Sequence, residues 1–234
     1  MNNKLYKQFS MTIDDFQKKV LPIEWTERSI LLSEGFALCA IAKMYDIDVL
    51  IESGTYNGRS TKIWTKFFET NIDIYSIDIH INNKARNFLK NDRVILIEGD
   101  SNSIIRDITS KYQEKKVGIF IDGPKGKEAV YLLEKLIDYQ NVYFIGIHDL
   151  HRNDFTKNRP LRARDLFEKI NYDKFLTDDM DFVNSYSFLD NYDLNQIDQE
   201  NQLSWKPNCY IDTKTNTIAR DLGSYGPTIG FALK

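Results

Sequence analysis

Acidic residues stand at the ends of five predicted strands, and this is the pattern in the chain with the clearest chemistry. The five acids are Glu52, Asp78, Asp100, Asp122 and Asp149. In an open α/β sheet, ligands bind at the edge where the carboxyl ends of the parallel strands meet. One such acid is often a helix cap or a turn residue, but five in succession indicate a binding or catalytic site. Carboxylates there hold hydroxyl groups, ammonium groups or hard cations and accept protons.

The first of these acids leads into a glycine turn, Glu52-Ser-Gly-Thr-Tyr-Asn-Gly-Arg-Ser60. Gly54 and Gly58 allow a sharp turn and a close approach of a ligand to the backbone. The helix expected from residue 60 to 68 would direct its free N–H groups at that ligand. Dinucleotide sites use G-x-G-x-x-G and P-loops use G-x-x-x-x-G-K-[ST]. The spacing here differs from both, and Tyr56 occupies the place of the middle glycine, so a ligand bound through phosphates is disfavoured.

A ligand made of an amino acid and a nucleoside fits the acids better. Its carboxylate would meet the helix N-terminus near Gly58, and its ammonium group would meet Glu52 directly or through water. Asp78 is placed to accept both hydroxyl groups of a ribose. Asp100 and Ser101 are placed to face an adenine edge. S-adenosylmethionine consists of these parts.

With these motifs, roughly residues 47–149 resemble the class I S-adenosylmethionine-dependent methyltransferases. The other matching motifs are Tyr75-Ser-Ile-Asp-Ile79, Glu98-Gly-Asp-Ser101 and Phe120-Ile-Asp-Gly123. The chain is most similar to small-molecule O-methyltransferases of bacterial natural-product and polysaccharide pathways. The resemblance implies an enzyme with a small-molecule acceptor, such as a sugar or glycan precursor. It implies cofactor contacts from Glu52, Gly54, Thr55, Tyr56, Asn57, Gly58, Ser60, Asp78, Asp100, Ser101 and Asp122.

Two devices are expected for removing the proton of an acceptor hydroxyl group. In the first, Asp122 and Asp149 share a hard cation such as Mg²⁺, which lowers the pKa of the hydroxyl. Metal-dependent relatives use acids at comparable strand ends with a third ligand, where this chain has Leu150. In the second, His148 or His151 is the general base, and His148 is favoured. Strand alternation would aim His148 away from a cleft that Asp149 lines.

The elements that position these residues alternate along the chain. This rhythm predicts an α/β fold, a Rossmann-like doubly wound sheet with helices on both faces. The resemblance adds a seven-stranded sheet whose last strand is antiparallel. Strands are expected near 48–52, 74–79, 93–98, 117–121 and 142–148, and the sixth and seventh at Phe182–Leu189 and Thr228–Leu233. Helices are expected near 11–20, 26–45, 60–69, 83–90, 103–112, 127–138 and 161–170.

One domain over residues 1–234 is expected, because no repeat or low-complexity linker divides the chain. Within it, residues 1–46 form N-terminal helices, 47–150 the cofactor-binding core and 151–234 an acceptor-side segment. Residues 190–225 are rich in Asn, Asp and Tyr. A polar segment of that length is often functional, and we interpret it as a partly ordered lid.

Composition limits the class of protein. A formal net charge of −3 gives no basic field for nucleic acid. No apolar stretch is long enough to span a bilayer, and the first residues lack the apolar core of a signal peptide. A cytoplasmic location is the default, and a homo-oligomer stays open. Two alternatives to a methyltransferase also stay open: another nucleotide-cofactor enzyme on a Rossmann-like sheet, and a non-catalytic binding protein of the same fold.

Overall fold

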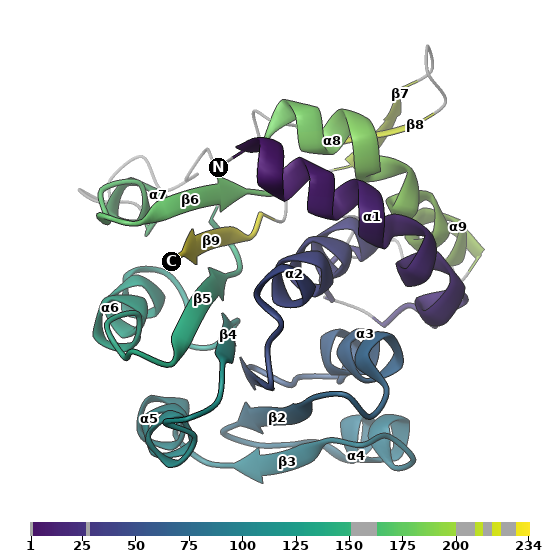
Figure 1. Ribbon diagram of the computed structural model, residues 1–234. Coiled ribbons are helices and arrows are strands. Elements are labelled where there is room, and N and C mark those ends of the chain that lie inside the picture. The colour runs from purple at the N-terminus through teal and green to yellow at the C-terminus, as the bar shows by residue number, and fades with distance from the viewer. Residues whose placement is uncertain (1, 27–28, 151–162, 200–208, 213–216, 221–227) are drawn as a thin grey trace, which may run out of the picture.

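A mixed β-sheet flanked by helices forms the centre of the computed structural model, which describes residues 2–26, 29–150, 163–199, 209–212, 217–220 and 228–234 (Figure 1). The strands of this sheet are β1 (Val49–Ser53), β2 (Asp73–Asp78), β3 (Ile95–Glu98), β4 (Val117–Ile121), β5 (Val142–Ile147), β6 (Asp173–Leu176) and β9 (Gly230–Leu233). β7 (Cys209–Asp212) and β8 (Thr217–Arg220) form a separate hairpin.

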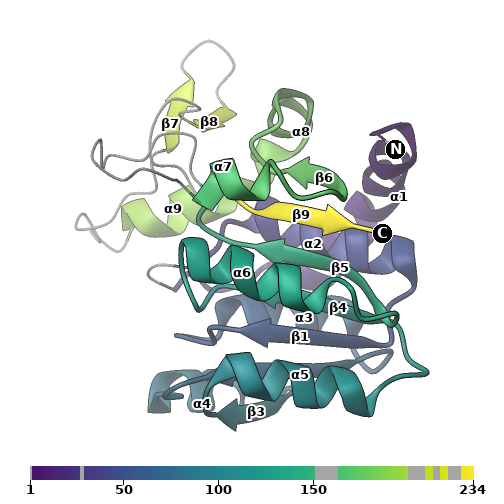
Figure 2. The same cartoon turned by 90° about the vertical axis from the view of Figure 1, so that its left-hand side faces the viewer.

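The strand order in the described part of the chain is β3-β2-β1-β4-β5-β9-β6. β1 to β5 pair in parallel, and β9 runs antiparallel to both β5 and β6. In Figure 2 the arrows of β1 and β5 point in one direction and that of β9 in the opposite direction. The expected Rossmann-like sheet of seven strands with an antiparallel last strand is therefore confirmed.

Helices cover both faces of the sheet (Figures 1 and 2). One face carries α1 (Asn2–Val20), α2 (Leu32–Tyr45), α3 (Arg59–Phe68) and α4 (Asn83–Leu89), and the other carries α5 (Ser101–Lys111), α6 (Lys127–Leu136) and α7 (Ala163–Phe167). β1 and β4 are buried at every position because both of their faces are covered. The core on the α1–α3 side is rich in phenylalanine, whereas the α5–α6 side is mainly aliphatic.

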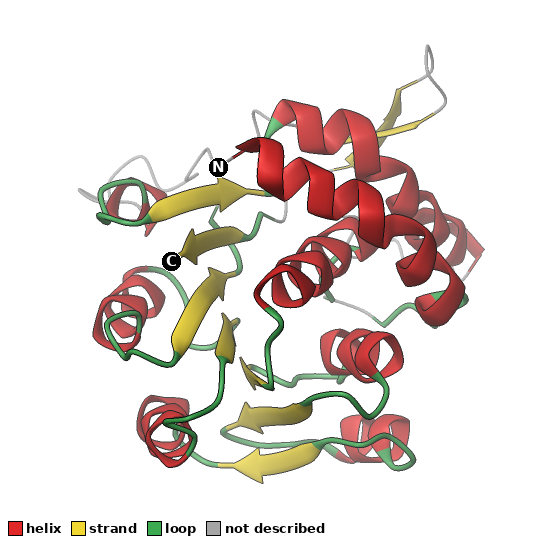
Figure 3. Cartoon of the chain, viewed as in Figure 1, coloured by secondary structure: helices red, strands yellow, loops and turns green. Residues whose placement is uncertain are grey.

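The sixth strand lies elsewhere than expected. Phe182–Leu189 is helical and forms α8 (Met180–Tyr186) and the 3₁₀ helix η1 (Ser187–Asp190) (Figure 3). Asp179 caps α8 by accepting the N–H groups of Asp181 and Phe182. Phe182 and Tyr186, one helical turn apart, both pack against Phe9 of α1. The apolar residues thus follow a helical period, and β6 provides the sixth strand instead.

The N-terminal helices also differ from the prediction. α1 begins at Asn2 rather than near residue 11, and α2 begins at Leu32 rather than at residue 26. Ser29 and Ile30 instead approach the glycine turn. The region expected to be a polar lid contains α9 (Asn191–Gln199) and the β7–β8 hairpin, while 200–208, 213–216 and 221–227 lie outside the described residues. Among the described helices, none combines the length and the apolar character that crossing a membrane requires.

Candidate active site

The glycine turn joins β1 to α3 at the carboxyl edge of the sheet. Gly54 has a φ of 100°, and a Cβ there would lie 3.0 Å from the carbonyl carbon of Asp122. Only glycine therefore allows the ends of β1 and β4 to approach so closely. Gly58, with a φ of 84°, is the N-cap of α3, and no described side chain caps this helix. The first N–H groups of α3 thus remain available to a ligand.

Replacing Gly54 with alanine is expected to cost about 1–3 kcal/mol more unfolding free energy than replacing Gly126 with alanine. Both glycines have a positive φ, but a Cβ at Gly126 meets nothing within 4 Å. Comparing the two substitutions therefore separates the cost of a side chain at a positive φ from the cost of the clash with the end of β4. Urea unfolding of the two variants measures the difference, and equal losses would contradict this interpretation of the turn.

Asp78, at the end of β2, holds the glycine turn in place. Its Oδ2 accepts the N–H of Tyr56 at 2.9 Å, and its Oδ1 accepts the N–H of His80 at 3.3 Å. Tyr56 has a φ of 45°, and its carbonyl oxygen accepts a hydrogen bond from Asn82. A carboxylate has lone pairs for further donors. The contact of Asp78 with a ribose stays a prediction, and the structure adds a role for Asp78 in shaping the turn.

Glu52 lies fully buried beneath the turn. Its Oε2 accepts hydrogen bonds from Thr61 and, at 2.7 Å, from Ser76, whereas Oε1 has no hydrogen-bond partner among the described residues. Burial raises the pKa of Glu52 to about 7, although nearby hydroxyl groups lower it. The Oγ1 of Thr55 lies 2.7 Å from the Oγ of Ser76 and joins the same network. Glu52 therefore supports the turn from within, and its contact with an ammonium group stays a prediction.

The remaining residues predicted to contact a cofactor lie at the same edge. Asn57 and Ser60 line a hollow of about 10 Å³ together with Gly54, Ile30 and Asp122. Asp100 caps α5 by accepting the N–H of Asn102 at 3.1 Å, and Ser101 donates to the carbonyl oxygen of Gly123 at 3.2 Å. Asp100 thus has the role of a helix cap, and its contact with an adenine stays a prediction.

A compact charged cluster lies where β4 and β5 end. Asp122, His148 and Asp149 bring one ligand-type atom each to within 4.8 Å of one another. The Nδ1 of His148 is 2.8 Å from Oδ1 of Asp122 and 3.4 Å from Oδ1 of Asp149. Asp149 has a φ of 64°, which departs from strand geometry. Both His148 and Asp149 therefore face Asp122, and the alternation expected from a regular strand does not apply.

His148 is held between acids. Its side chain is 8% exposed, and its Nε2 lies 3.6 Å from Oε2 of buried Glu34. Burial lowers the pKa of His148, but the carboxylates of Asp149, Asp122 and Glu34 outweigh it and hold that pKa well above its ordinary value. These carboxylates therefore favour the protonated imidazole, whereas a general base must be neutral. The role of His148 as a base stays a prediction that these surroundings disfavour, and His151 lies outside the described residues.

Lys125 completes the cluster. Its Nζ donates to Oδ1 of Asp122 and, at 2.6 Å, to Oδ2 of Asp149. These two carboxylates are the ones expected to share Mg²⁺, and an ammonium group of the chain already joins them. The donor set therefore does not fit a metal without displacement of Lys125. The sequence offered one signal for this contact, a lysine three residues after Asp122, but none for Glu34.

A buried ion pair links the turn to the C-terminal segment. The guanidinium of Arg59, the first residue of α3, contacts Oδ1 of Asp193 in α9, and both side chains are fully buried. Arg59 also donates to the carbonyl oxygens of Ile30 at 2.7 Å and Glu24 at 3.0 Å, and lies over the ring of Trp25. Sequence reasoning missed this ion pair. Because Arg59 also lines the hollow, the pair fixes α9 beside it.

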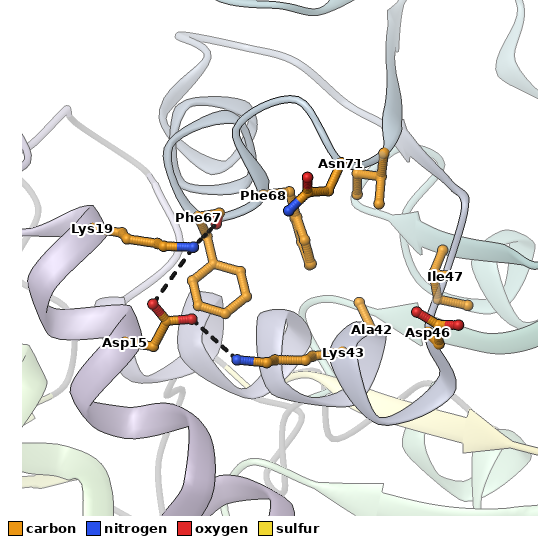
Figure 4. Close-up of a pocket in the computed structure, with 10 residues that line it drawn as sticks. Asp15, Lys19, Ala42, Lys43, Asp46, Ile47, Phe67, Phe68 and Asn71 are labelled. Carbon is orange, nitrogen blue, oxygen red and sulfur yellow. Dashed lines mark hydrogen bonds and ion pairs between the residues drawn. The ribbon is translucent and has the colours of Figure 1, made fainter.

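A wider cavity, of about 260 Å³, lies at the opposite edge of the sheet (Figure 4). Ile47 and Ile72, which precede β1 and β2, help line it. The carboxylate of Asp15 lies between the ammonium groups of Lys19 and Lys43, at 3.5 and 3.0 Å. These charged groups are paired with each other, and the cavity is remote from the glycine turn and the acidic strand ends.

Comparisons with known proteins give matches in structure. No family model matches the chain, and no curated protein matches it. An O-methyltransferase from Bacillus cereus in complex with SAH is 16% identical, with 97% of this chain and 91% of that chain covered and a TM-score of 0.46. The O-methyltransferase TomG from Streptomyces achromogenes, in complex with SAM, is 11% identical, with 97% and 90% covered and a TM-score of 0.47. The SAH-bound methyltransferase PaMTH1 from Podospora anserina is 15% identical, with 100% and 89% covered and a TM-score of 0.42. At such low identities, the SAM and SAH in those structures are properties of those proteins.

Proposed function

We propose that this protein is an S-adenosylmethionine-dependent methyltransferase. The observation that supports this most is the glycine turn with its uncapped α3 N-terminus, flanked by Asp78 and opening beside the charged cluster. An amino-acid carboxylate suits the first N–H groups of α3. A ribose suits a carboxylate at the end of β2. The turn lacks the spacing of a phosphate-binding loop.

We further propose transfer to an oxygen atom of a small molecule, such as a sugar or glycan precursor. When bound, the cofactor supplies an electrophilic methyl group, whose bond to sulfur breaks as the bond to oxygen forms. The chain has to hold the acceptor in line and keep water away. The acceptor oxygen would lie against Asp122 and Asp149. Its proton then passes to a carboxylate of this pair, because the acids around His148 favour the protonated imidazole, which has no lone pair to accept it.

No step is assigned to a metal ion, because Lys125 joins the two carboxylates that a metal would need. We also propose one domain, a cytoplasmic location, and neither nucleic acid nor membrane as a partner, on the composition of the chain. A homo-oligomer stays open.

Calorimetry with S-adenosylhomocysteine tests the proposed cofactor. We expect it to bind more tightly than NAD or ATP, and Asp78→Ala to weaken it by about 10–100-fold through loss of charged hydrogen bonds. Asp78→Asn keeps an acceptor for the N–H of Tyr56 and separates turn geometry from ligand contact. Asp107→Ala, on the exposed side of α5, is the matched control.

Tighter binding of NAD or ATP would instead support another nucleotide-cofactor enzyme. Binding of none of the three compounds would support a non-catalytic protein of this fold.

A further inference from the structure

Lys125 lies between the carboxylates of Asp122 and Asp149. Its Nζ donates a hydrogen bond to one oxygen of each carboxylate. The distance to the oxygen of Asp149 is 2.6 Å. The lysine belongs to the short segment between β4 and α6, so the chain delivers it to the carboxyl edge of the sheet. One cation shared by two carboxylates is the arrangement that a hard divalent ion would adopt. In this chain the shared cation is an ammonium group.

Among the residues that the structure describes, the other groups around the pair leave little room for a metal. Oδ1 of Asp122 faces both the Nζ of Lys125 and, at 2.8 Å, the Nδ1 of His148. Leu150, which follows Asp149, is 1% exposed. A Cβ on Gly230 would lie 2.4 Å from its Cδ1, so Leu150 is tightly packed against β9 and supplies no ligand atom. A divalent ion would also be strongly repelled by an ammonium group at contact distance.

We propose that the ammonium group of Lys125 takes the place of a divalent cation between Asp122 and Asp149, so that methyl transfer proceeds without a metal. This inference rests on the proposed methyltransferase function. Lys125 has a third N–H for the acceptor oxygen, and its charge favours the negative charge that develops there. The hydroxyl proton goes to a carboxylate oxygen of the pair, the O–CH₃ bond forms, and the S–CH₃ bond breaks with its electrons left on sulfur.

Titration with Mn²⁺, with the free ion counted by electron paramagnetic resonance, tests this inference without an acceptor substrate. Lys125→Met removes the charge but keeps an unbranched side chain. Lys125→Arg keeps the charge, and Lys127→Met makes the same charge change two residues away. We expect Lys125→Met to bind Mn²⁺ at least about tenfold more tightly than wild type, and Lys125→Arg and Lys127→Met to behave as wild type. A further change, Asp149→Asn, should abolish the gained binding.

Two results would overturn the inference. One is that the wild type binds Mn²⁺ as tightly as Lys125→Met does, and that Asp149→Asn abolishes this binding. The other is no gain of Mn²⁺ binding in a folded Lys125→Met variant, because the position would then not be a cation site. Calorimetry with S-adenosylhomocysteine on the same wild-type sample keeps the two proposals apart. If that ligand fails to bind while the Mn²⁺ pattern holds, the proposed function is wrong and the cation role of Lys125 stands.

Discussion

Replacing Asp193 with alanine is expected to lower the free energy of unfolding by about 3–5 kcal/mol, because it leaves a buried guanidinium without its counter-ion. Arg59 is 1% exposed and has Asp193 as its carboxylate partner. Oδ2 of Asp193 also accepts the N–H of Leu32 at 2.9 Å, so the substitution leaves the first turn of α2 without this acceptor. Urea unfolding of both proteins at pH 8, above the value of about 7 to which burial raises the pKa of Asp193, measures the loss.

Two further variants identify the cause of that loss. Asp107→Ala removes an exposed carboxylate from α5 and should change the free energy of unfolding by less than about 0.5 kcal/mol. Replacing both partners, with Arg59→Met and Asp193→Leu, removes the unpaired charge and should restore much of the stability. A loss below about 1 kcal/mol in Asp193→Ala would contradict a buried ion pair at this place.

The second large effect is a dependence of stability on pH that Glu52 causes. Burial raises the pKa of Glu52 from 4.5 to about 7 in the folded protein. The folded state therefore binds this proton more tightly than the unfolded state, and the stability it contributes is full below about pH 4.5. As pH rises through 7 this contribution is lost, and it amounts to about 3 kcal/mol.

Glu52→Gln should remove this contribution, because the amide stays neutral at every pH. We expect the difference in unfolding free energy between Glu52→Gln and wild type to change by about 3 kcal/mol from pH 4.5 to 8, in favour of the variant at high pH. Glu128→Gln, an exposed change in the first turn of α6, is the control. Parallel pH profiles for Glu52→Gln and wild type would show that Glu52 is not held in a buried, protonated form.

The parallel strands could be predicted because burial on both faces leaves continuous apolar runs in the sequence. The strand at Val117–Ile121 has the predicted bounds. The same signal failed at Phe182–Leu189, where apolar residues suit a strand or a helix. There the packing of Phe182 on Phe9 selects the helix, and no local pattern encodes that contact.

Part of the candidate site could be predicted from the order of strands and helices along the chain. Parallel topology alone brings the five acids to one edge, so the glycine turn, Asp78 and the Asp122–Asp149 pair could be predicted to lie there. That Asp149 faces the same side as His148 depends on the φ of 64° at Asp149, which the sequence does not specify. The pairing of Arg59 with Asp193 joins residues 134 positions apart and leaves no motif.

A crystal structure of the protein with S-adenosylhomocysteine tests the proposed cofactor site most directly. We expect the amino-acid carboxylate at the N-terminus of α3, beside Gly58, and the ribose on the carboxylate of Asp78. The sulfur should face the cluster of Asp122, Lys125 and Asp149. Crystals soaked at saturating concentration that show the ligand away from the glycine turn, or no ligand at all, would contradict the proposal.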